Sequence, residues 1–143
     1  MNKRLQVTPA RCIGCRTCEI ACAFSHPAAA RPGSPQGGGP GPTRIRAYPI
    51  KPPESGVPVV CLQCDSAACV RVCPTQALQR DDRTGAILVS EDRCILCRAC
   101  VWACPWGNVG YDEGRKVIHK CDLCAGDPQC ARYCPSRALE TFE

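Results

Sequence analysis

The sequence predicts an α+β fold of short helices and short strands whose interior is formed largely by cysteine. Three observations support this prediction. The 143-residue chain contains 16 cysteines, whereas Leu, Ile, Val and Phe together supply only 26 residues, which is little for an aliphatic core. The cysteines fall into four groups of four with related spacing. Proline follows the last cysteine in three of the groups, and because proline cannot continue a helix, these helices must be short.

The four groups form an internal repeat that leaves no cysteine over. Each group begins with C-x2-C and ends with a cysteine four residues after its third. Groups one and three share the tighter spacing C-x2-C-x2-C-x3-C, and groups two and four have four and five residues before the third cysteine. In chain order the groups are Cys12, Cys15, Cys18 and Cys22; Cys61, Cys64, Cys69 and Cys73; Cys94, Cys97, Cys100 and Cys104; and Cys121, Cys124, Cys130 and Cys134.

The elements expected around these groups are correspondingly small. We expect helices of one or two turns at residues 18–24, 69–73 and 100–104. Alternating polar and apolar residues predict a strand at 43–48, paired with a strand at 57–60 across 49–56, with Pro58 in an edge position. Further strands are expected at 85–89 and 116–119. Residues 27–42 include ten glycines and prolines, which predicts a surface loop or flexible insertion.

The cysteines are expected to bind metal rather than to form disulfides. No signal peptide precedes the first group and no apolar run could span a membrane, so we expect a cytoplasmic protein in which thiols stay reduced. The tighter spacing, followed by proline in group three, is typical of cysteines that hold [4Fe–4S] clusters. Zinc is the alternative, but zinc sites usually combine two C-x2-C pairs separated by a long spacer.

The formal charge of +5 does not indicate nucleic-acid binding, because the Lys and Arg residues are scattered and only seven residues are aromatic. Sixteen thiolates and four oxidised clusters would bring the charge to about −3. We therefore interpret the basic residues as compensation for buried negative charge, with Lys116, Lys120 and Arg98 as candidates to tune reduction potentials.

Four further side chains have less specific expectations. Trp102 and Trp106 flank Cys104, and we expect them to shield a cluster or to fill the core. His26 and His119 match no ligand pattern and are expected to be structural.

Several segments resemble known iron–sulfur proteins. Residues 73–105 (CPTQAL…GAILVSEDRCILCRACVWACP) are similar to the middle of a two-cluster bacterial ferredoxin. Three segments resemble the four-cluster, ferredoxin-like electron-transfer subunits of molybdenum and tungsten oxidoreductases, of the dimethyl-sulfoxide reductase and formate dehydrogenase type: 10–22 (ARCIGCRTCEIAC), 59–74 (VVCLQCDSAACVRVCP) and 104–124 (CPWGNVGYDEGRKVIHKCDLC). Related small subunits serve carbon monoxide dehydrogenases, hydrogenases and tungsten aldehyde oxidoreductases. The resemblance spans nearly the whole chain except the insertion, and Ala23 departs from it by replacing the proline after Cys22.

The resemblance implies how four [4Fe–4S] clusters share the cysteines. In that family, groups two and three share one pair of clusters, and groups one and four share the other; the competing arrangement pairs neighbouring groups. We name each implied set by its first member. The Cys12 set is Cys12, Cys15, Cys18 and Cys134; the Cys22 set is Cys22, Cys121, Cys124 and Cys130; the Cys61 set is Cys61, Cys64, Cys69 and Cys104; and the Cys73 set is Cys73, Cys94, Cys97 and Cys100.

The fold implied is two nested bacterial-ferredoxin-like modules around four iron–sulfur clusters. The outer module comprises residues 1–26 and 108–143, the insertion residues 27–42, and the inner module residues 43–107 with a leading strand.

The function implied is electron transfer between a large molybdenum or tungsten catalytic subunit, with an aldehyde oxidoreductase preferred, and a second redox partner. That second partner would be a flavoprotein, a ferredoxin or another copy of this chain. No organic cofactor is expected, because the chain lacks a phosphate loop and a dinucleotide fingerprint. No catalytic residue, nucleic-acid partner or membrane insertion is expected either. The alternatives are a free polyferredoxin electron carrier, an electron-transfer partner of a hydrogenase or carbon monoxide dehydrogenase, and a zinc-bound interaction module.

Overall fold

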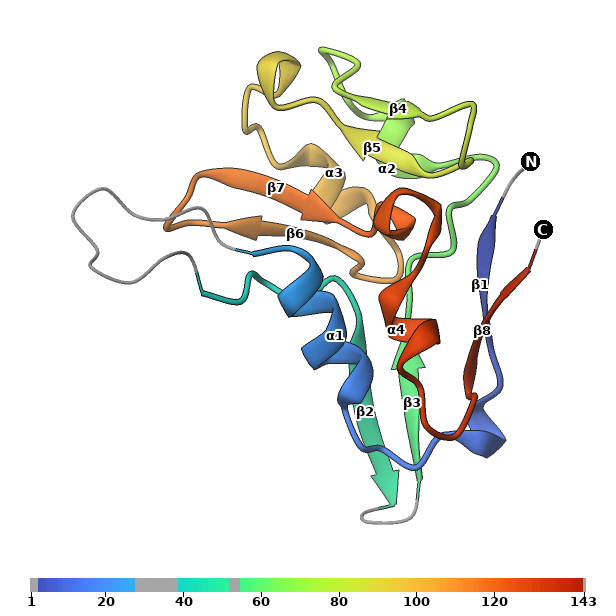
Figure 1. The fold of residues 1–143 in the computed structure, drawn as a ribbon. Coiled ribbons are helices and arrows are strands. Elements are labelled where there is room, and N and C mark those ends of the chain that lie inside the picture. The colour runs from blue at the N-terminus through green and yellow to red at the C-terminus, as the bar shows by residue number, and fades with distance from the viewer. Residues whose placement is uncertain (1–2, 28–38, 52–54, 143) are drawn as a thin grey trace.

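The computed structural model describes residues 3–27, 39–51 and 55–142, and in them short helices alternate with short strands (Figure 1). The strands are β1 (Arg4–Val7), β2 (Arg46–Lys51), β3 (Ser55–Val59), β4 (Leu78–Arg80), β5 (Ile87–Val89), β6 (Val109–Asp112), β7 (Val117–Lys120) and β8 (Leu139–Phe142). The α-helices are α1 (Thr17–Ser25), α2 (Ala68–Arg71), α3 (Ala99–Ala103) and α4 (Gln129–Arg132). The predicted mixture of short helices and strands is confirmed. None of the helices in the described ranges has the length and apolar character needed to cross a membrane.

The strands of the described residues pair in twos, as four antiparallel sheets. Three sheets join strands that are close in sequence: β2 with β3, β4 with β5, and β6 with β7. The fourth joins β1 to β8, with Arg4 opposite Phe142, so the two ends of the chain run side by side (Figure 1). The β1–β8 sheet therefore brings group one close to group four.

The predicted hairpin is present as β2–β3, with Ala47 opposite Pro58. Its first strand begins three residues later than expected, because the Thr43 hydroxyl donates to the Ile45 carbonyl at 2.7 Å and accepts from the Ile45 amide at 3.4 Å. Local side-chain bonds of this kind compete with strand pairing. Pro58 is tolerated because β3 has a neighbouring strand on one side only.

The other predicted elements are found with small shifts in their bounds. The strands expected at 85–89 and 116–119 correspond to β5 and β7, and the three expected helices correspond to α1, α2 and α3. Five elements are not predicted by the sequence patterns, and each has four residues or fewer: β1, β4, β6, β8 and α4. Most of the predicted insertion, residues 28–38, lies outside the described residues.

Two small cores hold these elements together, and cysteine belongs to both. The first core comprises Leu5, Cys18, Cys22, Ile45, Ala47, Val60, Ala86, Leu123, Cys130 and Leu139. The second comprises Ala67, Cys69, Leu78, Ile87, Cys100, Val109 and Ile118. The first core therefore combines groups one and four with β2, and the second combines groups two and three with β6 and β7. In Figure 1 the β4–β5 sheet, α2 and α3 occupy one end of the molecule, and α1 and α4 lie nearer the other.

Candidate metal centres

All sixteen cysteines lie among the described residues, and all are free thiols. Six are buried, and only Cys15 and Cys97 are exposed. Because cysteine is also an ordinary core residue, burial alone does not identify a metal ligand. The positions of the sulfur atoms relative to one another are more informative.

Three cavities each bring together the four cysteines of one implied set, which come from two different groups. The first is lined by Cys12, Cys15, Cys18 and Cys134. The second is lined by Cys22, Cys121, Cys124 and Cys130, and also by Cys61 of group two. The third is lined by Cys61, Cys64, Cys69 and Cys104. The structure thus brings together the members of the Cys12, Cys22 and Cys61 sets, and their role as ligands of one cluster each stays a prediction.

Part of the Cys73 set is also brought together. Cys73 and Cys94 pack against the second core beside the buried Cys100, and the charges of Cys94 and Cys73 contribute to raising the Cys100 pKa. Cys97, the fourth member, is exposed. The Cys73 set is therefore more accessible to solvent than the Cys61 set, with which it shares the second core.

The helices connect the sets in pairs. Helix α1 carries Cys18 and Cys22, whose side chains lie one turn apart and line two different cavities. Helix α4 carries Cys130, and Cys134 lies just beyond its end. Because α1 packs against α4, as α2 packs against α3, the groups whose cysteines share cavities are those whose helices touch.

The same turn follows the last cysteine of groups two, three and four. The amide of the third residue after the cysteine donates to the cysteine carbonyl at 3.2–3.3 Å, from Gln76, Gly107 and Arg137 respectively. These three residues have positive φ values of 52°, 62° and 50°. Proline presets the bend, and the left-handed residue then redirects the chain into β4, β6 or β8.

This turn directs backbone amides at the sulfur atom. The Ala77 amide donates to Cys73 Sγ at 3.2 Å, and the Asn108 amide donates to Cys104 Sγ at 3.4 Å. Burial raises the pKa of Cys73, but hydrogen bonds from Thr75 and from the following amides outweigh it and lower the pKa overall. The pKa of Cys134 is lowered in the same way. Burial raises it, but hydrogen bonds from the Leu139 amide and neighbouring groups outweigh burial. Donors of this kind favour the thiolate, which is the form that binds metal.

Cys22 lacks the turn, because Ala23 stands where the other groups have proline and α1 continues to Ser25. Its sulfur receives donors from elsewhere in the fold. The Arg44 amide donates to Cys22 Sγ at 3.2 Å, and His26 Nδ1 lies 3.8 Å from the same sulfur. Burial raises the pKa of Cys22, but the bonds from His26 and Arg44 outweigh burial and lower it.

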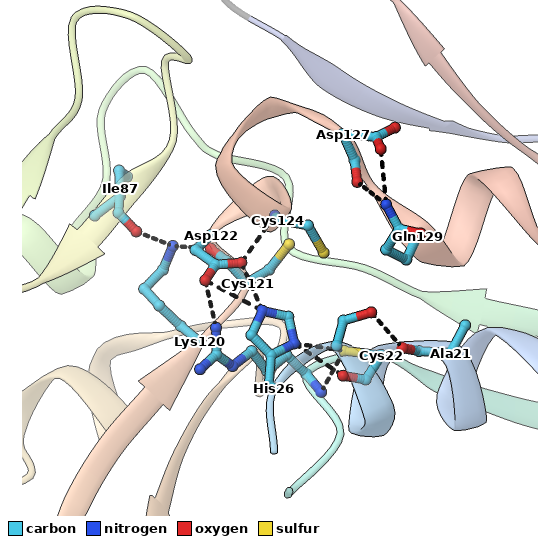
Figure 2. A network of polar contacts seen from close by, with 12 residues as sticks. Ala21, Cys22, His26, Ile87, Lys120, Cys121, Asp122, Cys124, Asp127 and Gln129 are labelled. Atoms are coloured by element: carbon cyan, nitrogen blue, oxygen red, sulfur yellow. Dashed lines mark hydrogen bonds and ion pairs between the residues drawn. The ribbon is translucent and has the colours of Figure 1, made fainter. Parts of the chain in front are cut away.

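Asp122 holds these two donors in place, and its contact with His26 can be followed in Figure 2. His26 Nε2 donates to Asp122 Oδ1 at 3.0 Å, Arg44 Nη1 donates to Oδ2 at 2.7 Å, and the Cys124 amide donates to Oδ1 at 2.9 Å. Burial alone would raise the Asp122 pKa, but the bonds from His26 and Cys124 lower it, and the bond to Asp122 raises the pKa of His26. His26, Asp122 and Cys124 offer ligand atoms within 4.8 Å of one another. Because Cys124 also lines the second cavity, we assign His26 and Asp122 to the support of that cavity.

The donor sets fit a metal–sulfur core. Burial raises the pKa of Cys18 and Cys100 to about 11 and that of Cys121 to about 12, and charges on nearby cysteines add to the increase. Four thiolates in one buried place repel one another, so they can coexist only around bound cations. Four thiolates are the usual ligands of a [4Fe–4S] cluster, although structural zinc can also be held by four.

Some expectations for single residues need correction. Trp102 is 87% exposed, so the idea that it fills the core is wrong; the side chain stands on the outer surface of α3. Trp106 is 57% exposed yet lines the third cavity. Sequence reasoning also missed Gln63, whose side chain is buried and bonds to the Cys121 carbonyl at 2.9 Å. A glutamine inside C-x2-C carries no signal of such a contact.

Comparison with known protein families gives two matches in this chain. Residues 55–143 match the 4Fe-4S dicluster domain, and residues 9–25 match a 4Fe-4S binding domain. Together these segments contain all four cysteine groups.

Relatives with similar sequences have names that refer to electron transport. A Pyrococcus furiosus protein named aliphatic sulfonate oxidoreductase, polyferredoxin-like subunit, is 40% identical over 90% of this chain and 69% of its own length. The Escherichia coli electron transport protein HydN is 36% identical over 97% of this chain and 87% of its own. Among solved structures, a chain of the active-site complex BamBC of benzoyl coenzyme A reductase matches 98% of this chain and 76% of its own, with a TM-score of 0.50 and 22% identity, which is a likeness of fold.

Proposed function

The chain belongs to the 4Fe-4S dicluster family of ferredoxin-like proteins, and from this premise we propose that it is an electron-transfer subunit that relays electrons through four [4Fe–4S] clusters. The clusters would be held by the Cys12, Cys22, Cys61 and Cys73 sets. The observation that carries the proposal is that each of three cavities brings together all four cysteines of one set, which come from two separate groups.

The residues around each set supply what a bound cluster needs. Bound [4Fe–4S] clusters provide one-electron redox chemistry. The cysteines hold the metal, and the amides after each Cys-Pro turn donate to sulfur and stabilise its negative charge. The aliphatic residues of the two cores keep water away from the buried sulfurs, which strengthens these electrostatic interactions.

Contacts between neighbouring sets support a linear order of the four sites. Burial is the main cause that raises the pKa of Cys130 in the Cys22 set, and the nearby charge of Cys18 in the Cys12 set raises it further. Cys61 lines the second cavity as well as the third, so the Cys22 and Cys61 sets adjoin. Helices α2 and α3 link the Cys61 set to the Cys73 set. The proposed order is therefore Cys12, Cys22, Cys61 and Cys73 sets.

The two ends of this order are also where the sulfurs reach the surface. Cys15 belongs to the first set and Cys97 to the last, and they are the two exposed cysteines. Electron exchange with a partner requires close approach, so an exposed site at each end suits two separate redox partners. We propose a catalytic subunit at one end and a flavoprotein, a ferredoxin or another copy of this chain at the other.

For the domain organisation we propose the nested arrangement, with an outer module of residues 1–26 and 108–143 and an inner module of residues 43–107. The packing of α1 against α4 and of α2 against α3 supports it. Three strands make contacts across the boundary, because Ala47 of β2 packs in the first core and Val109 of β6 and Ile118 of β7 pack in the second.

The catalytic partner is proposed from the relatives. The Pyrococcus furiosus relative is named as a subunit of an aliphatic sulfonate oxidoreductase, and we propose by analogy that this chain serves the catalytic subunit of an oxidoreductase. The molybdenum or tungsten class of that enzyme, with an aldehyde as substrate, is our proposal from the sequence resemblance.

Metal analysis tests the cluster content. In protein purified without oxygen we expect about sixteen irons per chain and an equal amount of acid-labile sulfide, four from each cluster. Zinc in stoichiometric amount with little iron would overturn the proposal. Reduction by the substrate only when the catalytic subunit is present, followed by reoxidation by a separate acceptor, tests the relay, and substrate turnover by this chain alone would contradict it.

A further inference from the structure

Lys120 is a buried cation at the junction of two of the proposed cluster sites. It is the last residue of β7, immediately before Cys121, and is only 3% exposed. Its side chain lines the third cavity together with the Cys61 set. Figure 2 shows the ammonium group directed at Ile87, whose carbonyl it contacts at 2.9 Å.

Gln63 holds the Lys120 ammonium in this position. Lys120 Nζ donates to Gln63 Oε1 at 3.2 Å and to the Cys121 carbonyl at 3.1 Å. Gln63 is itself 1% exposed, accepts from the Ile87 amide at 2.9 Å and donates to the Cys121 carbonyl at 2.9 Å. Through Cys121, these bonds connect the loop of the Cys61 set to the Cys22 set.

Among the residues that the structure describes, no carboxylate balances this charge. Every described hydrogen-bond acceptor of Lys120 is a neutral oxygen, and none of the ion pairs in the described part of the chain includes it. A buried charge without an opposite charge nearby is strongly unfavourable. The candidates for that opposite charge are the cysteine sulfurs, because Lys120 lines the same cavity as the four cysteines of the Cys61 set and immediately precedes Cys121.

We propose that Lys120 is the counter-charge built into the boundary between the two modules, and that it raises the reduction potential of the cluster held by the Cys61 set. The inference rests on the proposed function, because it takes the ligand sets from it. Reduction adds one negative charge to a cluster, and a fixed cation nearby stabilises that charge through a medium of low dielectric constant. Since Gln63 fixes the cation on one side of the Cys61 loop, the effect should be greatest for this set.

The test compares two lysines of the same segment. Lys120→Met removes the buried charge while keeping an unbranched chain of similar length, and Lys116→Met removes an exposed charge from the turn before β7. The full chain would be titrated with dithionite and redox mediators and followed by paramagnetic resonance. The signal of the Cys61 set is identified as the one lost in Cys104→Ser.

We expect Lys120→Met to lower the equilibrium constant for reduction of that site at least tenfold, a shift of about 59 mV to lower potential. The sequence also suggests Lys116 for this role, but its charge is exposed and screened by water and salt, so Lys116→Met should shift the midpoints far less than Lys120→Met. Lys120→Arg should keep the wild-type midpoint. Lys120→Met with full iron content and an unshifted midpoint would overturn the proposal.

If Lys120→Met assembles its clusters poorly, its iron content still tests the proposal. Loss of iron in Lys120→Met that Lys120→Arg restores supports the need for the charge, whereas equal loss in both shows that only shape matters and overturns it. A Cys104→Ser variant that loses neither iron nor a signal would contradict the ligand sets of the proposed function, irrespective of the behaviour of Lys120.

Discussion

The pairing of group one with group four can be tested by replacing one cysteine, Cys134. In the structure Cys134 lines the same cavity as Cys12, Cys15 and Cys18, although more than a hundred residues of chain separate it from them. Serine has nearly the same shape but replaces the soft thiolate with an alcohol, which is a poor ligand for iron. If each set holds one cluster, Cys134→Ser should reduce the iron content from about sixteen to about twelve per chain, because one cluster holds four irons.

The assay combines iron analysis with paramagnetic resonance of the reduced protein. The spectrum of Cys134→Ser should lack the same signal as that of Cys12→Ser and should retain the signal lost in Cys94→Ser. Ser136→Ala is a matched control, since the Ser136 hydroxyl lies 3.7 Å from Cys134 Sγ and its removal leaves all four cysteines in place. A Cys134→Ser spectrum that matches Cys94→Ser would refute the reasoning and favour the pairing of neighbouring groups.

Two further predictions concern the scaffold. Gly56→Ala should lower the iron content by about four per chain, because its Cβ would lie 2.9 Å from the backbone of Gly14 in the loop of the Cys12 set, whereas Gly39→Ala, with no atom within 4 Å, should not. The bonds from Thr84, led by its hydroxyl, lower the pKa of Asp81, so this carboxylate stabilises the fold above its ordinary pKa of about 3.9 and loses that effect as the pH falls through the lowered value. The free energies of unfolding of wild type and Asp81→Asn, measured in guanidinium, should therefore differ most near neutral pH and converge in acid. An Asp81→Asn protein as stable as wild type at pH 7 would contradict this prediction. Unchanged iron content in Gly56→Ala would contradict the other one.

The local features of this protein could be predicted from its sequence because their causes are local. The proline after Cys73, Cys104 and Cys134 cannot continue a helix, so the preceding helices could be predicted to be short. The tight cysteine spacing indicated [4Fe–4S] clusters, which the family matches confirm. Alternation of residue type likewise located β2, although this strand begins three residues later than predicted.

Features that depend on distant contacts could not be predicted in this way. The sequence RLQV of β1 forms a strand because it pairs with LETF of β8 at the other end of the chain. The donors to Cys22 come from Arg44 and His26, which Asp122 holds in place from 78 and 96 residues further along the chain. Nothing near Gln63 in the sequence indicates that its side chain bonds to Cys121 and Lys120. These contacts exist only once the cysteine groups have come together.

The shortness of the elements shows why the cysteine pattern also determines the topology. The longest helix, α1, has nine residues, and isolated helices of that length are marginal in water. Two-stranded sheets are marginal as well when nothing packs against them. Each element must therefore be stabilised by its neighbours in the two cores. The helices contribute buried cysteines to these cores, Cys18, Cys22 and Cys130 to the first and Cys69 and Cys100 to the second. Helix α1 supplies cysteines to both the Cys12 and Cys22 sets, and α4 does the same together with Cys134 just beyond its end. Metal bound there would therefore tie the two ends of the chain together, and the β1–β8 sheet closes over the same junction. The cysteine spacing within each group makes one helix contribute to two sets. It therefore also determines which distant segments of the chain lie next to each other.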